Sequence, residues 1–105
     1  MYVLDTGVSN HSDLGSRLGA GWSAYNDSSH QDCHGHGTYC AGVVAGQHTG
    51  VAKGATIHSV RVLDCDGTGQ LSNVVAGIEW MLAHHLSDHP KGISIASLSI
   101  GGDRT

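Results

Sequence analysis

The chain has 105 residues, of which 13% are charged and 5% aromatic, and its formal net charge at pH 7 is −4. A chain of this length supports one domain with a single modest core, because it hides roughly 60–70% of its surface on folding. The negative charge gives no electrostatic reason to expect nucleic-acid binding, which requires a basic patch. No apolar run approaches the roughly 18 residues of a membrane span.

Strands and helices are predicted to alternate along the chain. Residues 2–5, "YVLD", indicate a short buried strand that ends in a turn, and residues 18–25 indicate a weaker strand. Small apolar residues bounded by glycines predict a tightly packed helix over residues 37–46. Residues 55–64 alternate and are rich in β-branched side chains, which is typical of a strand.

The second half of the chain continues this pattern. A turn-rich stretch over residues 65–70 precedes an amphipathic helix, predicted from about 72 to 86 by apolar residues at helical spacing. Residues 93–100 form the last predicted strand. The alternation favours an α/β fold with a mostly parallel sheet and right-handed crossovers. Asp5 and the Gly67/Gly69 turn both follow strands, so they belong at the edge where functional residues gather in such sheets.

The chain opens inside a predicted buried strand and ends just beyond another. Met1 leads directly into the first strand without the basic segment or cleavage site of a signal peptide. We therefore expect a fragment of a longer protein, and we expect it to expose apolar faces when it stands alone.

Asp5 and His36 are candidates for a catalytic pair. A carboxylate that closes a buried strand is costly unless it is paired. The alternative for Asp5 is a hydrogen bond to its own turn. His36 opens the predicted helix between Gly35 and Gly37, which leave room for its ring. A nearby carboxylate would offset the positive end of the helix and fix the imidazole tautomer. That is the pairing of base and orienting group found in triad hydrolases.

Four segments, in this order, resemble the subtilisin-like serine proteases (subtilases), and most closely their proteinase K-type branch: "VLDTGVSNHSDL", "GHGTYCAGVVAG", "GVAKGATIHSVRVLDCDGTGQLS" and "ASLSIGG". The resemblance covers essentially the whole chain, and the order of Asp before His agrees with the order Asp, His, Ser in subtilisin. It implies a partial subtilisin-like three-layer α/β fold with a mostly parallel sheet and flanking helices. Residues 1–105 would then be a partial catalytic domain that lacks the nucleophile-bearing C-terminal part.

The resemblance also assigns roles to residues. Asp5 would orient the histidine, and His36 would act as general base and acid. A peptide would add as a strand between two edges. One pocket would take the second residue before the cut, and an apolar pocket would take the residue two positions further out. These substrate-binding residues are Gly67, Thr68 and Gly69 on one edge, Ser99, Ile100 and Gly101 on the other, Leu63 as the wall of the pocket for the second residue before the cut, and Leu71, Val74 and Ile100 in the apolar pocket. Core packing is the alternative for the apolar pocket residues.

Two departures from the family pattern stand out. Tyr39 replaces a second histidine that the family usually has, a position outside the triad. No segment resembling G-T-S-M-A is present, so we expect the nucleophilic serine to lie outside these residues and the fragment alone to be inactive.

The three cysteines allow one pair and one leftover thiol. Similar subtilases have a bridge at the positions of Cys33 and Cys65, so the resemblance predicts this disulfide. It would close a loop of about 30 residues, stabilise the fold by roughly 3–4 kcal/mol and imply an oxidising, secreted setting. Cys40, four residues after His36 on the same helix face, is expected to be a free buried thiol, the alternative being a nucleophile paired with His36.

A metal site is the competing interpretation of the stretch around His36. Cys33, His34, His36 and Cys40 offer four ligands, but their spacing fits no common zinc template, so we expect no metal there. His34 and most other histidines are predicted to lie on the surface. No cofactor is required, although calcium is compatible as a structural ion of the full-length protein. The acidic residues that could hold an ion weakly are Asp27, Asp32, Asp64 and Asp66.

The resemblance implies that the full-length protein is a secreted, monomeric serine endopeptidase, made with a propeptide, that hydrolyses peptides or proteins through an Asp-His-Ser triad. Two alternatives remain open. One is a non-enzymatic secreted regulatory subtilase that only processes itself and then binds other proteins. The other is a metal-binding module.

Overall fold

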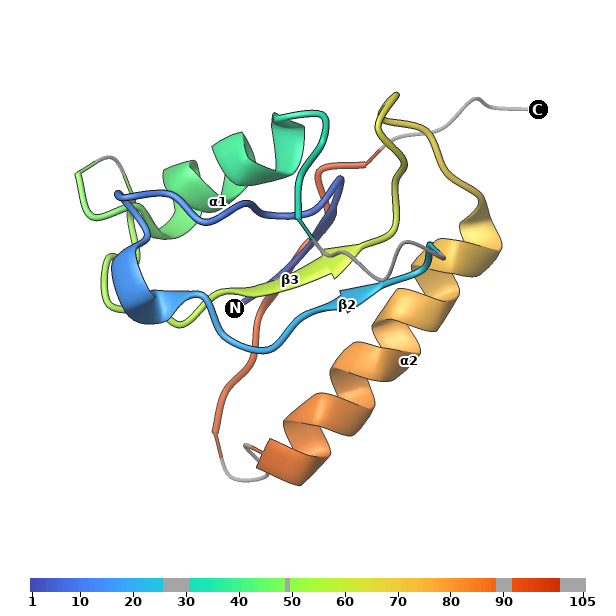
Figure 1. The fold of residues 1–105 in the computed structure, drawn as a ribbon. Helices are drawn as coiled ribbons and strands as arrows, with labels where there is room; N and C mark the ends of the chain where they lie inside the picture. The colour runs from blue at the N-terminus through green and yellow to red at the C-terminus, as the bar shows by residue number, and fades with distance from the viewer. Residues whose placement is uncertain (26–30, 49, 89–91, 101–105) are drawn as a thin grey trace.

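A four-stranded parallel sheet lies between two helices in the computed structural model, which describes residues 1–25, 31–48, 50–88 and 92–100 (Figure 1). The strand order is β2-β3-β1-β4, and every pairing is parallel. The strands are β1 (Tyr2–Asp5), β2 (Trp22–Ser23), β3 (His58–Arg61) and β4 (Ala96–Ser97). Helix α1 spans His36–Ala45, and helix α2 spans Leu71–Asp88. The predicted three-layer α/β architecture is confirmed.

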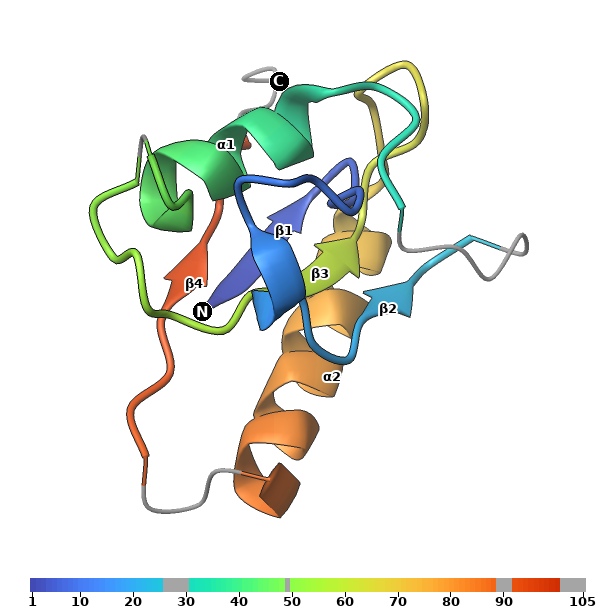
Figure 2. The same cartoon turned by 60° about the vertical axis from the view of Figure 1, so that its left-hand side comes forward.

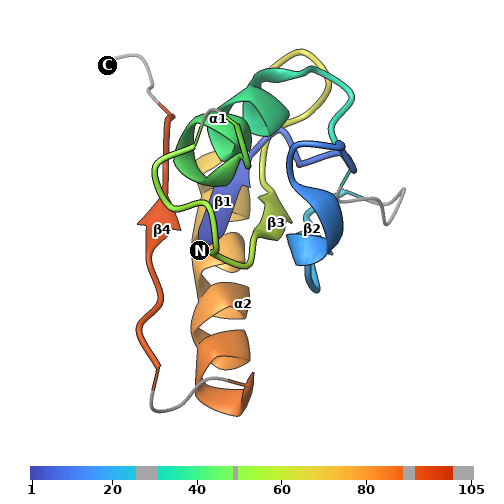
Figure 3. The same cartoon turned by 90° about the vertical axis from the view of Figure 1, so that its left-hand side faces the viewer.

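Strand β1 is central to this architecture because both of its faces are covered (Figure 3). Alternate side chains of a strand point to opposite faces of the sheet. Val3 therefore packs with Ala41 and Ala45 of α1, whereas Tyr2 and Leu4 pack on the side of α2. Fully buried parallel strands are expected to be continuously apolar. The run "YVL" satisfies that expectation and leaves Asp5 as the polar exception at the strand end.

The strands outside the centre are shorter than predicted. Of residues 18–25 only Trp22 and Ser23 form a strand, with an isolated bridge between Leu18 and Ile57 before it. Strand β4 pairs with β1 over two residues, Ala96 and Ser97, where a strand over 93–100 was expected. Both strands lie at the edges of the sheet, where a strand has one hydrogen-bonding partner. The chain also has an unpredicted 3₁₀ turn, η1 (Gly15–Arg17).

Most histidines are predicted to lie on the surface, and His58 is an exception, because it is only 5% exposed. Its ring stacks on Tyr2 with centroids 4.9 Å apart, and its Nδ1 lies 2.8 Å from the carbonyl oxygen of Ala20. A Cβ at Gly19 would come within 2.8 Å of the His58 ring, so the glycine makes room for it. The Tyr2 hydroxyl in turn meets Nδ1 of His84 at 2.7 Å. Single-sequence patterns do not reveal such a packed aromatic cluster.

Apolar side chains are exposed on α2 and on the segment that leads into and out of β4. These residues are Leu71, Val75, Leu82, Leu86, Ile93, Ile95 and Leu98. The expected exposure of apolar faces is therefore present. None of the helices in the described ranges is long and apolar enough to cross a bilayer.

Candidate active site

Asp5 is the last residue of β1 and His36 the first residue of α1, and Figure 2 shows these two elements next to each other. Nδ1 of His36 lies 2.8 Å from Oδ1 and 3.0 Å from Oδ2 of Asp5. The Asp5 side chain is 1% exposed, whereas that of His36 is 43% exposed. The backbone N–H of Thr6 donates a further hydrogen bond to Asp5 Oδ1 at 2.7 Å. A buried carboxylate therefore holds one nitrogen of an imidazole that is open to solvent, the arrangement a general base requires.

Two glycines allow α1 to approach β1 closely enough for this contact. Gly35 has φ 113°, a left-handed conformation that glycine adopts at little cost. A Cβ at Gly37 would lie 2.0 Å from the carbonyl oxygen of Gly7, so only glycine fits there without movement of the backbone. The Gly37 N–H donates to Thr6 Oγ1 at 3.0 Å. The motif G-H-G thus brings the helix terminus onto the end of the strand.

A cleft of about 830 Å³ opens beside His36. Its lining includes every described residue to which the resemblance assigned substrate binding: Leu63, Gly67, Thr68, Gly69, Leu71, Val74, Ser99 and Ile100. Gly101 lies outside the described residues. The structure therefore brings the segments 67–69 and 98–100 together with His36 around one cavity.

The edge formed by Gly67, Thr68 and Gly69 is held by Asp64. Its carboxylate accepts hydrogen bonds from the backbone N–H groups of Thr68 (3.1 Å) and Asp66 (2.9 Å) and from the Thr68 hydroxyl. These hydrogen bonds, from Thr68 first, lower the pKa of Asp64. Gly67 has φ 81°, and a Cβ at Gly69 would lie 2.5 Å from the carbonyl oxygen of Val62. The glycines are thus required by the turn itself, whatever binds beside it.

His34 lines the same cleft, although the sequence predicted only a solvated loop residue. Its ring centroid lies 6.4 Å from that of His36. A Cβ on Gly67 would lie 3.1 Å from His34 Nε2, so the imidazole lies against the glycine edge of the cleft. The one sequence feature that indicates this position is that His34 directly follows Cys33. A disulfide from Cys33 to Cys65 draws the loop toward the segment 65–69.

A disulfide joins Cys33 to Cys65, with Cα atoms 5.0 Å apart, which confirms the predicted pairing. It links the loop before α1 to the loop after β3. Buried Arg61 packs against it, its Nη2 being 3.6 Å from Cys33 Sγ and 3.8 Å from Cys65 Sγ. Because a bridged cysteine offers no thiolate, the four-ligand zinc site proposed around His36 loses one of its ligands.

Cys40 is a free, half-buried thiol beneath His36. Its Sγ lies 3.9 Å from Nδ1 and 3.8 Å from Nε2 of His36, so it is aligned with the lone pair of neither nitrogen. Burial raises the pKa of the Cys40 thiol; a hydrogen bond with Ser99 opposes this shift, and the charge of Asp5 adds to it. A thiol that stays protonated is a poor nucleophile. The geometry therefore disfavours Cys40 as a nucleophile paired with His36.

One group of three potential metal ligands occurs among the described residues: Asp5, His36 and Cys40, with ligand atoms within 4.8 Å of one another. Its Asp5 oxygens already hold His36 Nδ1. The closeness of these three side chains follows from the histidine–carboxylate contact and from the i, i+4 spacing on α1.

The family model described as "Subtilase family" matches residues 2–105. The chain belongs to the subtilase family. Similar proteins include the "Extracellular serine proteinase" of Thermus sp. (strain Rt41A), 44% identical over 96% of this subtilase chain and 24% of the relative. The "Alkaline serine exoprotease A" of Vibrio alginolyticus is 42% identical over 99% of the chain and 19% of the relative. The chain thus spans about a quarter or less of the length of these curated relatives.

A solved structure, the "crystal structure of a cold adapted subtilisin-like serine proteinase", superposes on the subtilase chain with a TM-score of 0.81 and 40% identity. The match covers 99% of this chain and 37% of the solved one. The order of strands and helices described above is therefore that of a subtilisin-like fold over the matched part.

Replacing both Cys33 and Cys65 with serine in the full-length subtilase should lower the free energy of unfolding by about 3–4 kcal/mol. The bridge spans a sequence separation of 32, and its loss frees a loop of that size in the unfolded chain. Denaturant-induced unfolding under oxidising conditions measures the change. Cys40→Ser is the matched control, because Cys40 forms no bridge. Equal stability of the double variant and the control would contradict the prediction.

Proposed function

We propose that this subtilase chain supplies the general base, His36, and its orienting carboxylate, Asp5, to a secreted serine endopeptidase. The observation that supports the proposal is the 2.8 Å contact between His36 Nδ1 and buried Asp5, placed at the side of the cleft. In the proposal residues 1–105 are part of a catalytic domain, and the nucleophilic serine comes from another part of it. Alone, these residues would not complete the reaction.

In the proposed reaction the serine hydroxyl attacks the carbonyl carbon of the substrate while His36 Nε2 accepts its proton. Nδ1–H of His36 remains hydrogen-bonded to Asp5, which stabilises the imidazolium that forms. The imidazolium then gives its proton to the leaving amine, and the peptide bond breaks to leave an acyl-enzyme. Water repeats the sequence: His36 accepts its proton, the acyl group leaves as a carboxylic acid, and the serine is restored.

The proposed substrate is an extended peptide or protein segment that adds as a strand between residues 67–69 and residues 99–101. Gly67 and Gly69 place no side chain on the edge that would receive the peptide backbone. Leu63, Leu71, Val74 and Ile100 contribute apolar surface to the same cleft. We expect Leu63 to line the pocket for the second residue before the bond that is cut. The other three should favour an apolar side chain two residues further out.

Secretion, a monomeric state and a propeptide belong to the same proposal. The Cys33–Cys65 disulfide supports an oxidising setting for the mature protein. The reaction needs no cofactor, because the chemistry rests on proton transfer and nucleophilic attack. Calcium stays in the proposal only as a structural ion that is compatible with the full-length protein.

The test is turnover of an internally quenched peptide by the full-length mature protein, together with labelling by a sulfonyl fluoride. Multiple turnovers and stoichiometric labelling of one serine are expected of an endopeptidase. A protein that is cleaved from its propeptide but leaves the added peptide intact would overturn the proposal in favour of the regulatory, binding type of subtilase. Cleavage products that differ by single terminal residues would indicate an exopeptidase instead.

A further inference from the structure

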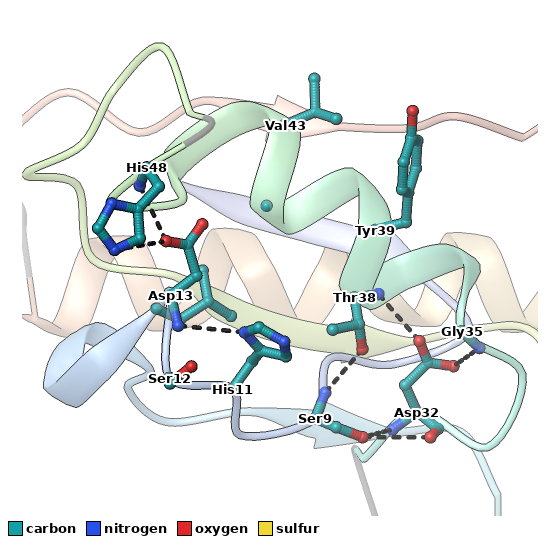
Figure 4. Close-up of a pocket in the computed structure, with 12 residues that line it drawn as sticks. Ser9, His11, Ser12, Asp13, Asp32, Gly35, Thr38, Tyr39, Val43 and His48 are labelled. Carbon is teal, nitrogen blue, oxygen red and sulfur yellow. Dashed lines mark hydrogen bonds and ion pairs between the residues drawn. The ribbon is translucent and has the colours of Figure 1, made fainter.

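The carboxylate of Asp32 accepts four hydrogen bonds from the residues around the catalytic pair. Oδ1 accepts from the Thr6 hydroxyl at 2.7 Å and from the backbone N–H groups of Gly35 at 2.7 Å and His34 at 2.8 Å. Oδ2 accepts from the N–H of Thr38 at 2.9 Å. Figure 4 shows the bonds to Gly35 and Thr38. A carboxylate that accepts this many bonds fixes the groups that donate them.

These donors lie on both sides of the contact between Asp5 and His36. Thr6 directly follows Asp5 at the end of β1, whereas Gly35 and Thr38 flank His36 at the start of α1. Thr6 Oγ1 donates to Asp32 and also accepts from the N–H of Gly37 at 3.0 Å, so a continuous path of hydrogen bonds runs from strand to helix. Asp32 thus connects the two elements whose relative position sets the His36–Asp5 distance.

Asp32 is itself held in place through its backbone. Its N–H donates to Ser9 Oγ at 3.0 Å, and the Ser9 hydroxyl lies 3.1 Å from its carbonyl oxygen (Figure 4). The N–H of Ser9 donates to Thr38 Oγ1 at 3.0 Å. The carboxylate is therefore presented from an anchored loop, which is the rigid support that a positioning group needs.

Asp32 is ionised at neutral pH. Burial alone would raise the pKa of Asp32, but hydrogen bonds from Gly35, Thr38 and Thr6 outweigh it and lower the pKa to about 2. The folded pKa lies below the unfolded one, so this stabilisation is complete above the unfolded value of about 3.9 and disappears as the pH falls through about 2. A negative charge beside the N-terminus of α1 is also favoured by the helix dipole.

We propose that Asp32 is a positioning residue of the reaction proposed above: it holds the end of β1 and the start of α1 in the register that keeps Asp5 on His36 Nδ1. Asp32 acts through Thr6, Gly35 and Thr38 and needs no contact with the substrate. The inference rests on the proposed function, because it assigns a role within the same catalytic pair.

The test is Asp32→Asn in the full-length protein, which keeps the shape of the side chain but removes its charge and turns an NH₂ group toward N–H donors. We expect kcat for a peptide substrate to fall about 10- to 100-fold, because a displacement near 1 Å at the reacting groups has an effect of this size. KM should change less than kcat, because Asp32 bonds to His34 at the side of the cleft but accepts no hydrogen bond from residues 67–69 or 98–100. In proton NMR, the downfield resonance of the Nδ1–H between His36 and Asp5 should weaken or move upfield.

Asp13→Asn is the matched control. Asp13 Oδ1 accepts the N–H of His48 at 2.8 Å beyond the C-terminal end of α1, so this variant also loses a carboxylate that accepts a backbone bond (Figure 4). It should leave kcat and the NMR resonance as in the wild type. An equal fall of kcat in Asp13→Asn, or an unchanged kcat and resonance in Asp32→Asn, would overturn the proposal.

Two further outcomes are decisive. If Asp32→Asn does not fold, Thr6→Val is the substitute test, because it removes the hydroxyl that bridges Asp32 and Gly37; Thr6→Ser keeps that hydroxyl and should behave as the wild type. A Thr6→Val variant with wild-type kcat and a wild-type Nδ1–H resonance would refute the proposal. If the wild-type protein has no turnover, the proposed function fails on its own. The NMR comparison then still decides whether Asp32 positions the pair.

Discussion

His36→Ala should lower kcat/KM of the full-length protein for peptide hydrolysis by about 10⁴-fold or more. Without the imidazole no group accepts the proton of the nucleophile, and the activity left in such hydrolases comes from binding and oxyanion stabilisation alone. His36 is the half-exposed partner of Asp5 and lines the cleft, so its removal leaves the buried core intact. Steady-state kinetics at several pH values, with circular dichroism as the check on folding, measures the effect.

His48→Ala is the control for this variant. His48 follows α1 beyond its C-terminal end, and its side chain is 80% exposed, so its loss should leave kcat/KM within about twofold. Retention of more than a tenth of wild-type activity by His36→Ala would show that His36 is not the general base. The proposed mechanism would then need a different proton acceptor.

Asp5→Asn should lower kcat by about 10⁴-fold while the fold persists. The asparagine amide can donate a hydrogen bond to Nδ1, which leaves the ring proton on Nε2, the nitrogen that must accept the proton of the serine. It also carries no charge to stabilise the imidazolium. Asp5 is 1% exposed and accepts both His36 Nδ1–H and the Thr6 N–H, so little solvent is present to replace it. Kinetics under saturating substrate isolates kcat.

The chain offers a matched histidine–carboxylate pair as a control. Asp88 Oδ2 lies 3.1 Å from His84 Nε2 on α2, and the Asp88 side chain is 53% exposed. Asp88→Asn makes the same chemical change at a pair outside the cleft and should leave kcat unchanged. Equal kcat values for the two variants would remove Asp5 from the mechanism.

The contact between Asp5 and His36 was predictable because two independent rules converge on it. A carboxylate that ends a buried strand needs a partner, and a parallel α/β sheet collects such groups at the carboxyl ends of its strands. The helix that begins at His36 supplies that partner from 31 residues further along the chain. The Cys33–Cys65 pairing, by contrast, followed only from the family resemblance, since three cysteines by themselves allow several pairs.

Features that depend on packing between distant residues were not predictable. Most histidines were expected on the surface, but His58 is buried, and its burial depends on the space that Gly19 leaves beside it. The role of His34 in the cleft depends on where the disulfide pulls its loop. Asp32 looked like any acidic loop residue, because none of its four donors is identifiable until strand and helix are placed side by side.

The Cys33–Cys65 bond has a consequence for how the cleft can adapt. It fastens the loop that carries His34 and leads into His36 to the loop that precedes the Gly67–Gly69 edge. A bulky ligand therefore cannot push these two parts of the wall apart. The opposite wall, residues 98–100, follows a strand paired with β1 at two positions. Large side chains should accordingly be accommodated by outward displacement of residues 98–100, while the His34 imidazole keeps a constant distance from the Gly67–Gly69 edge.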